Sequence, residues 1–176
     1  MIRIRPAEPG DAGALVDLAR HVGSEPGGWL LTTEAWRGAA EERRYLRAVG
    51  RSRDVAVLVA EDDGVLVGRL SLGRDPHPAS AHVADLGLMV AASHRRRGIG
   101  RAMLDAAVAW AREAGVRKLE LHVFPWNEAA LALYEAYGFE REGLRRGHYV
   151  RGGEEVDAIL MAYRVPPARP DDQAFD

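Results

Sequence analysis

A strand, a glycine-rich turn and a helix follow one another directly in the middle of this chain, and this junction limits the fold more than any other feature. Val83–Val90 is a mostly apolar run of strand length. After the turn, apolar residues recur at helical spacing, at Ile99, Met103, Ala106 and Trp110. We therefore expect a β-loop-α unit in which the turn lies at the entry of the helix.

The turn, residues 95–100, reads Arg-Arg-Arg-Gly-Ile-Gly. The first backbone N–H groups of a helix have no acceptor within the helix, and the macrodipole places about half a positive charge at that end. Glycine lacks a Cβ, so a ligand can approach the backbone closely, and the arginines add full charges. The turn predicts a site for an anion such as a cofactor pyrophosphate, held by Arg95, Arg96, Arg97, Gly98, Ile99, Gly100 and Arg101.

Two familiar phosphate-binding turns do not fit this segment. A P-loop needs a lysine after its last glycine, and the only lysine, Lys118, lies far beyond the turn. A dinucleotide-binding fingerprint needs glycine or alanine at its sixth position, where this chain has Met103, and it normally follows the first strand. Neither nucleotide-binding fold is therefore expected.

The composition indicates one globular domain without general affinity for nucleic acid or membranes. A chain of 176 residues that is 47% hydrophobic can bury one core, and we expect the domain over residues 1–165 with a tail at 166–176. The net charge is only −2, so the isolated basic cluster at residues 94–97 does not indicate a nucleic-acid surface.

The residue types that are missing exclude further classes of site. There is no cysteine, which excludes disulfides, cysteine nucleophiles and thiolate metal sites. The histidines match no metal-binding spacing, so no metal is expected. The first residues lack the apolar core of a signal peptide, and no apolar run is long enough to span a membrane. We therefore expect a cytoplasmic protein.

The order of predicted elements indicates an α/β fold. Strands are expected over residues 2–5, 55–61, 65–72, 83–90, 118–124, 147–151 and 155–163. Helices are expected after Asp11, over residues 33–49, from Ile99 and from Asn127. Such an order predicts a mixed central sheet with helices on both faces.

Two motifs in this arrangement resemble those of the GNAT acyltransferase superfamily. Residues 95–100 fit R/Q-x-x-G-x-G/A after a strand, and residues 127–139 fit N-x-x-A-[LI]-x-[LF]-Y-x-x-x-G-F. The resemblance runs from Ile2 to Val165 and is strongest between Val83 and Phe139. It implies a single-domain GNAT-like fold that uses acetyl-CoA as acyl donor.

The resemblance also implies roles for residues near the turn. It assigns the exposed backbone edge Leu88-Met89-Val90 to the pantetheine arm, with the amide of Met89 polarising the thioester carbonyl. Asn127 is expected both to cap its helix and to contact the cofactor. Tyr134 occupies the position of the proton donor, although an ordinary core aromatic would also fit its apolar helical stripe.

The general base and the acceptor site stay open at this point. Relatives tend to carry a carboxylate at the positions of Asp85 and His122, and the sequence favours neither as the base. Asp85 would alternatively orient a water or bind the substrate ammonium. Candidate acceptor contacts are Trp29, Asp85 and Tyr149, together with Leu30, Trp36, His148 and Glu155 in the segments that set specificity in the superfamily.

Three functions follow, in decreasing order of support from the motifs. The first is an N-acetyltransferase that moves an acetyl group to a primary amine by direct attack in a ternary complex, the amine being an amino acid, a small amine or a protein N-terminus. The second is a non-catalytic acyl-CoA-binding or regulatory module. The third is a phosphate or nucleic-acid binder that uses the arginine cluster. Dimers are common in the superfamily, so a homodimer is a further expectation.

Overall fold

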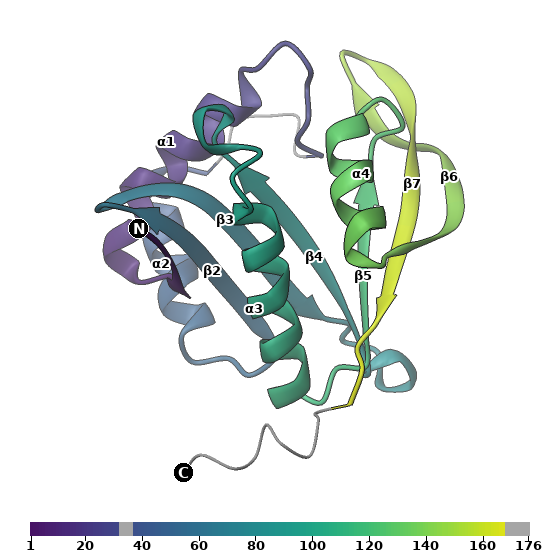
Figure 1. Cartoon of the computed structure of the whole chain (residues 1–176), viewed down its shortest axis with the longest axis horizontal. Coiled ribbons are helices and arrows are strands. Elements are labelled where there is room, and N and C mark those ends of the chain that lie inside the picture. Colours follow the sequence, from purple (N-terminus) through teal and green to yellow (C-terminus); the bar gives the residue numbers. More distant parts are fainter. Residues whose placement is uncertain (32–36, 168–176) are drawn as a thin grey trace.

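Seven strands form one mixed sheet in the order β1-β2-β3-β4-β5-β7-β6, in a computed structural model that describes residues 1–31 and 37–167 (Figure 1). The strands are β1 (Ile2–Pro6), β2 (Val55–Asp62), β3 (Val65–Arg74), β4 (Val83–Val90), β5 (Lys118–Val123), β6 (Glu140–Arg151) and β7 (Glu154–Arg164). All neighbouring pairs are antiparallel except β4 and β5, which run parallel.

Four α-helices cover the two faces of the sheet. They are α1 (Ala12–Gly23), α2 (Ala39–Val49), α3 (Ile99–Glu113) and α4 (Glu128–Tyr137). The larger core lies under α3 and α4, and a second core lies under α1 and α2 on the opposite face. In Figure 1, α3 crosses the near face of β2, β3 and β4, while α4 stands in front of β5. The expected mixed sheet with helices on both faces is confirmed.

Side chains along β4 and β5 point alternately to the face of the sheet covered by α3 and α4 and to the face covered by α1 and α2. Ala84 and Leu86 of β4 and Leu119 and Leu121 of β5 belong to the core under α3 and α4. The residues between them therefore point to the face of α1 and α2, because successive side chains of a strand alternate. Polar residues of both strands, including His122, thus share one face.

The parallel pair β4–β5 separates soon after it forms. Its register covers only Val83, Ala84 and Asp85 opposite Lys118, Leu119 and Glu120. β5 continues along β7 as far as Val123, while β4 continues along β3 as far as Val90. The two halves of the sheet therefore open like a V toward the carboxyl ends of β4 and β5 (Figure 1).

Some expected element boundaries differ from those observed. β6 begins at Glu140 instead of residue 147, because most of the strand is exposed and carries no apolar alternation that would signal it. α2 begins at Ala39, whereas residues 33–36 of the expected helix, Trp36 included, lie outside the described residues, as does most of the tail, 168–176. Among the described helices none is both long and apolar enough to cross a bilayer.

Candidate active site

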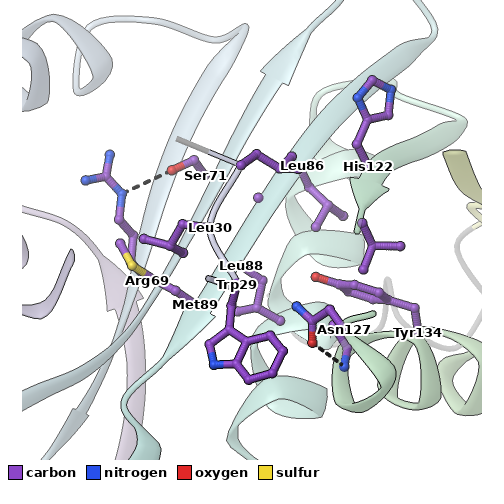
Figure 2. Close-up of a pocket in the computed structure, with 14 residues that line it drawn as sticks. Trp29, Leu30, Arg69, Ser71, Leu86, Leu88, Met89, His122, Asn127 and Tyr134 are labelled. Atoms are coloured by element: carbon purple, nitrogen blue, oxygen red, sulfur yellow. Dashed lines mark hydrogen bonds between the residues drawn. The ribbon is translucent and has the colours of Figure 1, made fainter. Parts of the chain in front are cut away.

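A cavity of about 250 Å³ lies where β4 and β5 diverge (Figure 2). It is lined by residues of the α1–α2 loop, of β3, β4 and β5, and of α4. These are Trp29, Leu30, Leu31, Arg69, Ser71, Leu86, Gly87, Leu88, Met89, His122, Val123, Asn127, Ala130 and Tyr134. The cavity thus collects most of the catalytic and acceptor candidates, but neither Asp85 nor Tyr149 lines it.

The backbone of β4 presents polar groups to this opening. The N–H of Ala91 donates to Val67 O (2.8 Å) and that of Asp75 to Val83 O (2.9 Å), so odd-numbered residues of β4 bond to β3. Backbone groups of alternate residues point to opposite sides in an antiparallel ladder. Those of Leu88 and Val90 therefore face the side that β5 has left. The amide of Met89 was expected to polarise the thioester carbonyl. It faces β3 and not the cavity, so this expectation is wrong.

The entry of α3 has the geometry of an anion site. Gly98 has φ +80° and is followed by the first helical residue, Ile99, so the N–H groups of Ile99, Gly100 and Arg101 lie in the first turn, where a helix offers them no acceptor. Nothing lies within 4 Å of where a Cβ of Gly98 would be, which leaves its backbone accessible. A Cβ at Gly100 would instead lie 2.8 Å from Leu133 Cδ2, so Gly100 permits close packing of α3 on α4.

The three arginines of the turn lie in different environments. Arg95 donates to both carboxylate oxygens of Glu25 (2.7 Å each) and to Val90 O (2.9 Å), so its guanidinium is turned away from the helix entry. Arg97 donates to Asp62 (3.1 Å) at the molecular surface. Arg96 is exposed and has φ +62°, an uncommon conformation for a residue with a side chain. The predicted cofactor contact of Arg95 therefore has a competing partner in the structure.

Asn127 and Tyr134 stand on α4 beside the opening. The side-chain oxygen of Asn127 accepts from the N–H of Ala130 (3.2 Å), which confirms it as the helix cap, and its side chain also lines the cavity. Tyr134 is 6% exposed, and in Figure 2 its hydroxyl points from α4 toward β4. Burial raises the pKa of this hydroxyl well above 10, so it stays protonated at neutral pH. Tyr134 packs in the core, as its apolar stripe predicted, and it also lines the cavity, while its role as proton donor stays a prediction.

His122 lies on the cavity wall within a group of polar aromatic side chains. Its Nδ1 is 2.8 Å from the hydroxyl of Tyr149, and its ring meets that of His148 edge-on with centroids 5.2 Å apart. Partial burial lowers the pKa of His122 below 6.5, and the nearby charge of Arg145 lowers it further. His122 is therefore neutral at pH 7 and able to accept a proton. Tyr149 therefore contacts His122, and its predicted contact with the acceptor stays a prediction.

Asp85 precedes the cavity residue Leu86 and forms a pair of carboxylates with Glu120. Asp85 was singled out from the sequence, but this pairing was not. Asp85 stands opposite Glu120 on the neighbouring strand, and the side chains of both point to the same face. Desolvation and the charges of Glu120 and Asp75 raise the pKa of Asp85 above 3.8. The negative charge of Glu120 is partly neutralised by Lys118, whose Nζ is 2.6 Å from the Glu120 carboxylate. Only the register of two parallel strands brings Asp85 and Glu120 together, so their sequence positions carried no signal.

A buried ion pair on the cavity floor was also missed. Arg69, on β3, is 3% exposed and donates to Glu42 of α2 (2.7 Å), which is fully buried, and to Ser71 (3.1 Å). Arg37 adds a second cation, with its Nε 3.3 Å from Glu42. Glu42 lies four residues before buried Leu46, which places it on the buried face of this amphipathic helix, and that spacing is the signal that could have found it.

Comparisons with known proteins agree with this geometry. The profile of the acetyltransferase (GNAT) family matches residues 25–139. The L-amino acid N-acetyltransferase AaaT of Escherichia coli K12 is 39% identical over 109 residues, which are 60% of this chain and 65% of that protein. The ribosomal protein bS18-alanine N-acetyltransferase of the same organism is 39% identical over 72 residues, which are 41% of this chain and 49% of that protein. The chain therefore matches less than two thirds of the length of either relative.

Two solved structures share the fold over nearly the whole chain. The ribosomal-protein-alanine N-acetyltransferase of Brucella melitensis is 28% identical, with a TM-score of 0.82 over 92% of this chain and 99% of that one. The protein yncA of Salmonella typhimurium, determined with its cofactor acetyl-CoA, is 22% identical, with a TM-score of 0.83 over 97% and 98% of the two chains.

Proposed function

The chain belongs to the acetyltransferase (GNAT) family, and from that premise we propose that it moves an acetyl group from acetyl-CoA to a primary amine by direct attack in a ternary complex. The observation that carries the proposal is the divergence of β4 from β5 after Asp85 and Glu120. It opens a cavity beside the β4 backbone that β5 no longer pairs, and the entry of α3 follows directly along the chain.

The residues present suit acetyl-CoA, which supplies an activated acetyl group as its thioester. The first-turn N–H groups of α3 offer donors to a diphosphate, since a helix entry binds anions through free amides and its dipole. Backbone groups of Leu88 and Val90 offer a strand edge to the peptide-like pantetheine arm, in the manner of an added β-strand. A structural relative determined with acetyl-CoA supports the same donor.

Proton transfer would be divided between His122 and Tyr134. A protonated amine is not a nucleophile, and neutral His122 would take a proton from it at the cavity wall. The Tyr149 hydroxyl, 2.8 Å from Nδ1, would hold the imidazole in one orientation. Tyr134, kept protonated by burial, would give its proton to the departing sulfur and regain one from the nitrogen as the amide forms. An amide of β4, that of Leu88 or Val90, would take the oxyanion role that the family resemblance assigned to Met89.

The lining of the cavity favours an acceptor with a single amine. Its volume of about 250 Å³ suits a small group rather than a large side chain. Arg69 is the charged residue on its floor, and no carboxylate is found among the described residues that line it, so a second ammonium has no partner there. We therefore propose an amino acid or a peptide N-terminus as acceptor, in line with the names of two relatives.

Release of free CoA tests this function directly. The chain has no cysteine, so a thiol-reactive dye reports the CoA released without background from the protein. Acetyl-CoA is offered with separate amino acids, short peptides with free N-termini and polyamines, and mass spectrometry identifies the acetylated product. We expect turnover with members of the first two groups. Release no faster than the enzyme-free blank with every amine would overturn the proposal.

A further inference from the structure

We propose that Arg95, although it opens the anion-binding turn, is a positioning residue for the acceptor: its ion pair with Glu25 holds the indole of Trp29 in place as a wall of the cavity. The inference rests on the proposed function, because it takes the Trp29 side of the cavity as the acceptor side. It departs from the sequence motif, which groups Arg95 with the residues that contact the cofactor.

The guanidinium of Arg95 is held by three hydrogen bonds to Glu25 and Val90. Nη1 and Nη2 donate to the two carboxylate oxygens of Glu25 at 2.7 Å each, and Nε donates to Val90 O at 2.9 Å. A two-point arginine–carboxylate pair fixes orientation as well as distance, since the guanidinium is a rigid planar fork. Arg95 thereby ties the end of β4 to the α1–α2 loop, 70 residues earlier in the chain.

Glu25 passes this constraint on to Trp29. The carboxylate oxygen that pairs with Nη1 of Arg95 also accepts from Nε1 of Trp29, at 2.8 Å. The indole folds back over Gly27, where a Cβ would lie 1.8 Å from Cζ2 of the ring. The side chain of Glu25 is only 15% exposed, so a lost partner leaves a poorly hydrated carboxylate behind. The position of the Trp29 ring thus depends on a chain of three side chains.

The backbone of the same loop is held separately, from the side of β5. Nε1 of Trp126 donates to Gly27 O (3.1 Å), and Arg151 donates to Gly28 O and to Leu30 O (3.3 Å). Loss of Arg95 should therefore leave the loop attached and the fold intact. The effect would be confined to the orientation of the Trp29 ring and to the acceptor that packs against it.

The test separates acceptor binding from cofactor binding in the Arg95→Gln variant. Glutamine is the other residue that the turn motif accepts, and it lacks the two-point fork. We expect the KM for the acceptor to rise about tenfold, while kcat and the Kd for acetyl-CoA, measured by calorimetry, stay within about twofold of wild type. Glu25→Gln should show the same pattern, and the double variant should be no worse than either single one. Arg141→Gln, which breaks an exposed ion pair with Glu135 remote from the cavity, is the matched control.

Two outcomes would overturn the inference. One is weaker acetyl-CoA binding in Arg95→Gln with an unchanged acceptor KM, because Arg95 would then act on the cofactor. The other is additive effects in the double variant, because the two residues would then act separately. If wild type acetylates no amine, the proposed function fails, and solvent exchange of the Trp29 indole N–H, followed by NMR, still decides this point. We expect faster exchange in Arg95→Gln than in wild type, and identical exchange would contradict the inference.

Discussion

At the scale of residues, burial acts on the two proton-transfer candidates in opposite directions. It raises the pKa of the Tyr134 hydroxyl and lowers that of the His122 imidazole, because the neutral form is favoured in both cases. At neutral pH, Tyr134 therefore retains a proton to give, and His122 has a lone pair to accept one. One partly enclosed cavity thus prepares a donor and an acceptor.

The donor role of Tyr134 predicts a loss confined to turnover. In Tyr134→Phe, kcat should fall about a hundredfold, since a positioned acid contributes about that much, while the Kd for acetyl-CoA changes little. Tyr137→Phe is the matched control on the same helix, because that hydroxyl bonds to exposed Asp105 outside the cavity. An unchanged kcat in Tyr134→Phe would show that the ring serves only the core.

The base role of His122 predicts the shape of the pH profile. Because its pKa is lowered, His122 should stay neutral above pH 6.5, and kcat/KM should fall only as the pH drops further through the lowered pKa. In His122→Gln we expect kcat/KM to fall at least about a hundredfold and this acidic limb to vanish. His77→Gln, remote from the cavity, should leave the profile as in wild type. If kcat/KM of His122→Gln still falls at acidic pH as in wild type, another group is the base, and Asp85 is the next residue to test.

At the scale of elements, the two glycines of the turn serve different purposes. Gly98 supplies a left-handed residue and an open backbone at the start of α3, whereas Gly100 lets α3 approach Leu133 of α4. The first purpose concerns the ligand and the second concerns packing between helices. The position of α4, and with it the position of Tyr134, therefore depends on the absence of a side chain at Gly100.

Gly100→Ala tests this packing role. The added methyl would lie 2.8 Å from Leu133 Cδ2, and overpacking of this kind costs about 1–3 kcal/mol of unfolding free energy. The double variant with Leu133→Ala should recover part of the loss, since it removes the group in conflict. Chemical denaturation measures both. A stability equal to wild type in Gly100→Ala would mean that the helices separate without cost.

Much of the element order could be predicted from the sequence, because it depends on local patterns. β4 has the predicted bounds, and Asn127 caps α4 as expected. The divergence of β4 and β5 was implied only by the family resemblance and could not be derived from the residues, since it depends on how far two strands stay paired rather than on either strand alone. The partner of Arg95 could not be predicted for a similar reason, because Glu25 is distant in sequence.

At the scale of the whole molecule, the candidate site is assembled from segments spread between Trp29 and Tyr134. The α1–α2 loop supplies one wall, β3 the floor, β4 and β5 the opening, and α4 the opposite side. The net charge of the protein is −2, so attraction of an anionic cofactor must come from the local field at the entry of α3 and not from the molecule as a whole. Cofactor binding therefore depends on one small region of the surface.

Calorimetric titration with acetyl-CoA and with acetyl-pantetheine tests the central claim most directly, because the second ligand carries the thioester arm without the diphosphate. If the entry of α3 holds the diphosphate and the open edge of β4 holds the arm, acetyl-CoA should bind one to one and at least about tenfold more tightly than acetyl-pantetheine. Raising the salt concentration should reduce the difference in affinity between acetyl-CoA and acetyl-pantetheine, because salt screens the charge of the diphosphate. Equal affinity for the two ligands, or no heat of binding with acetyl-CoA, would contradict the account.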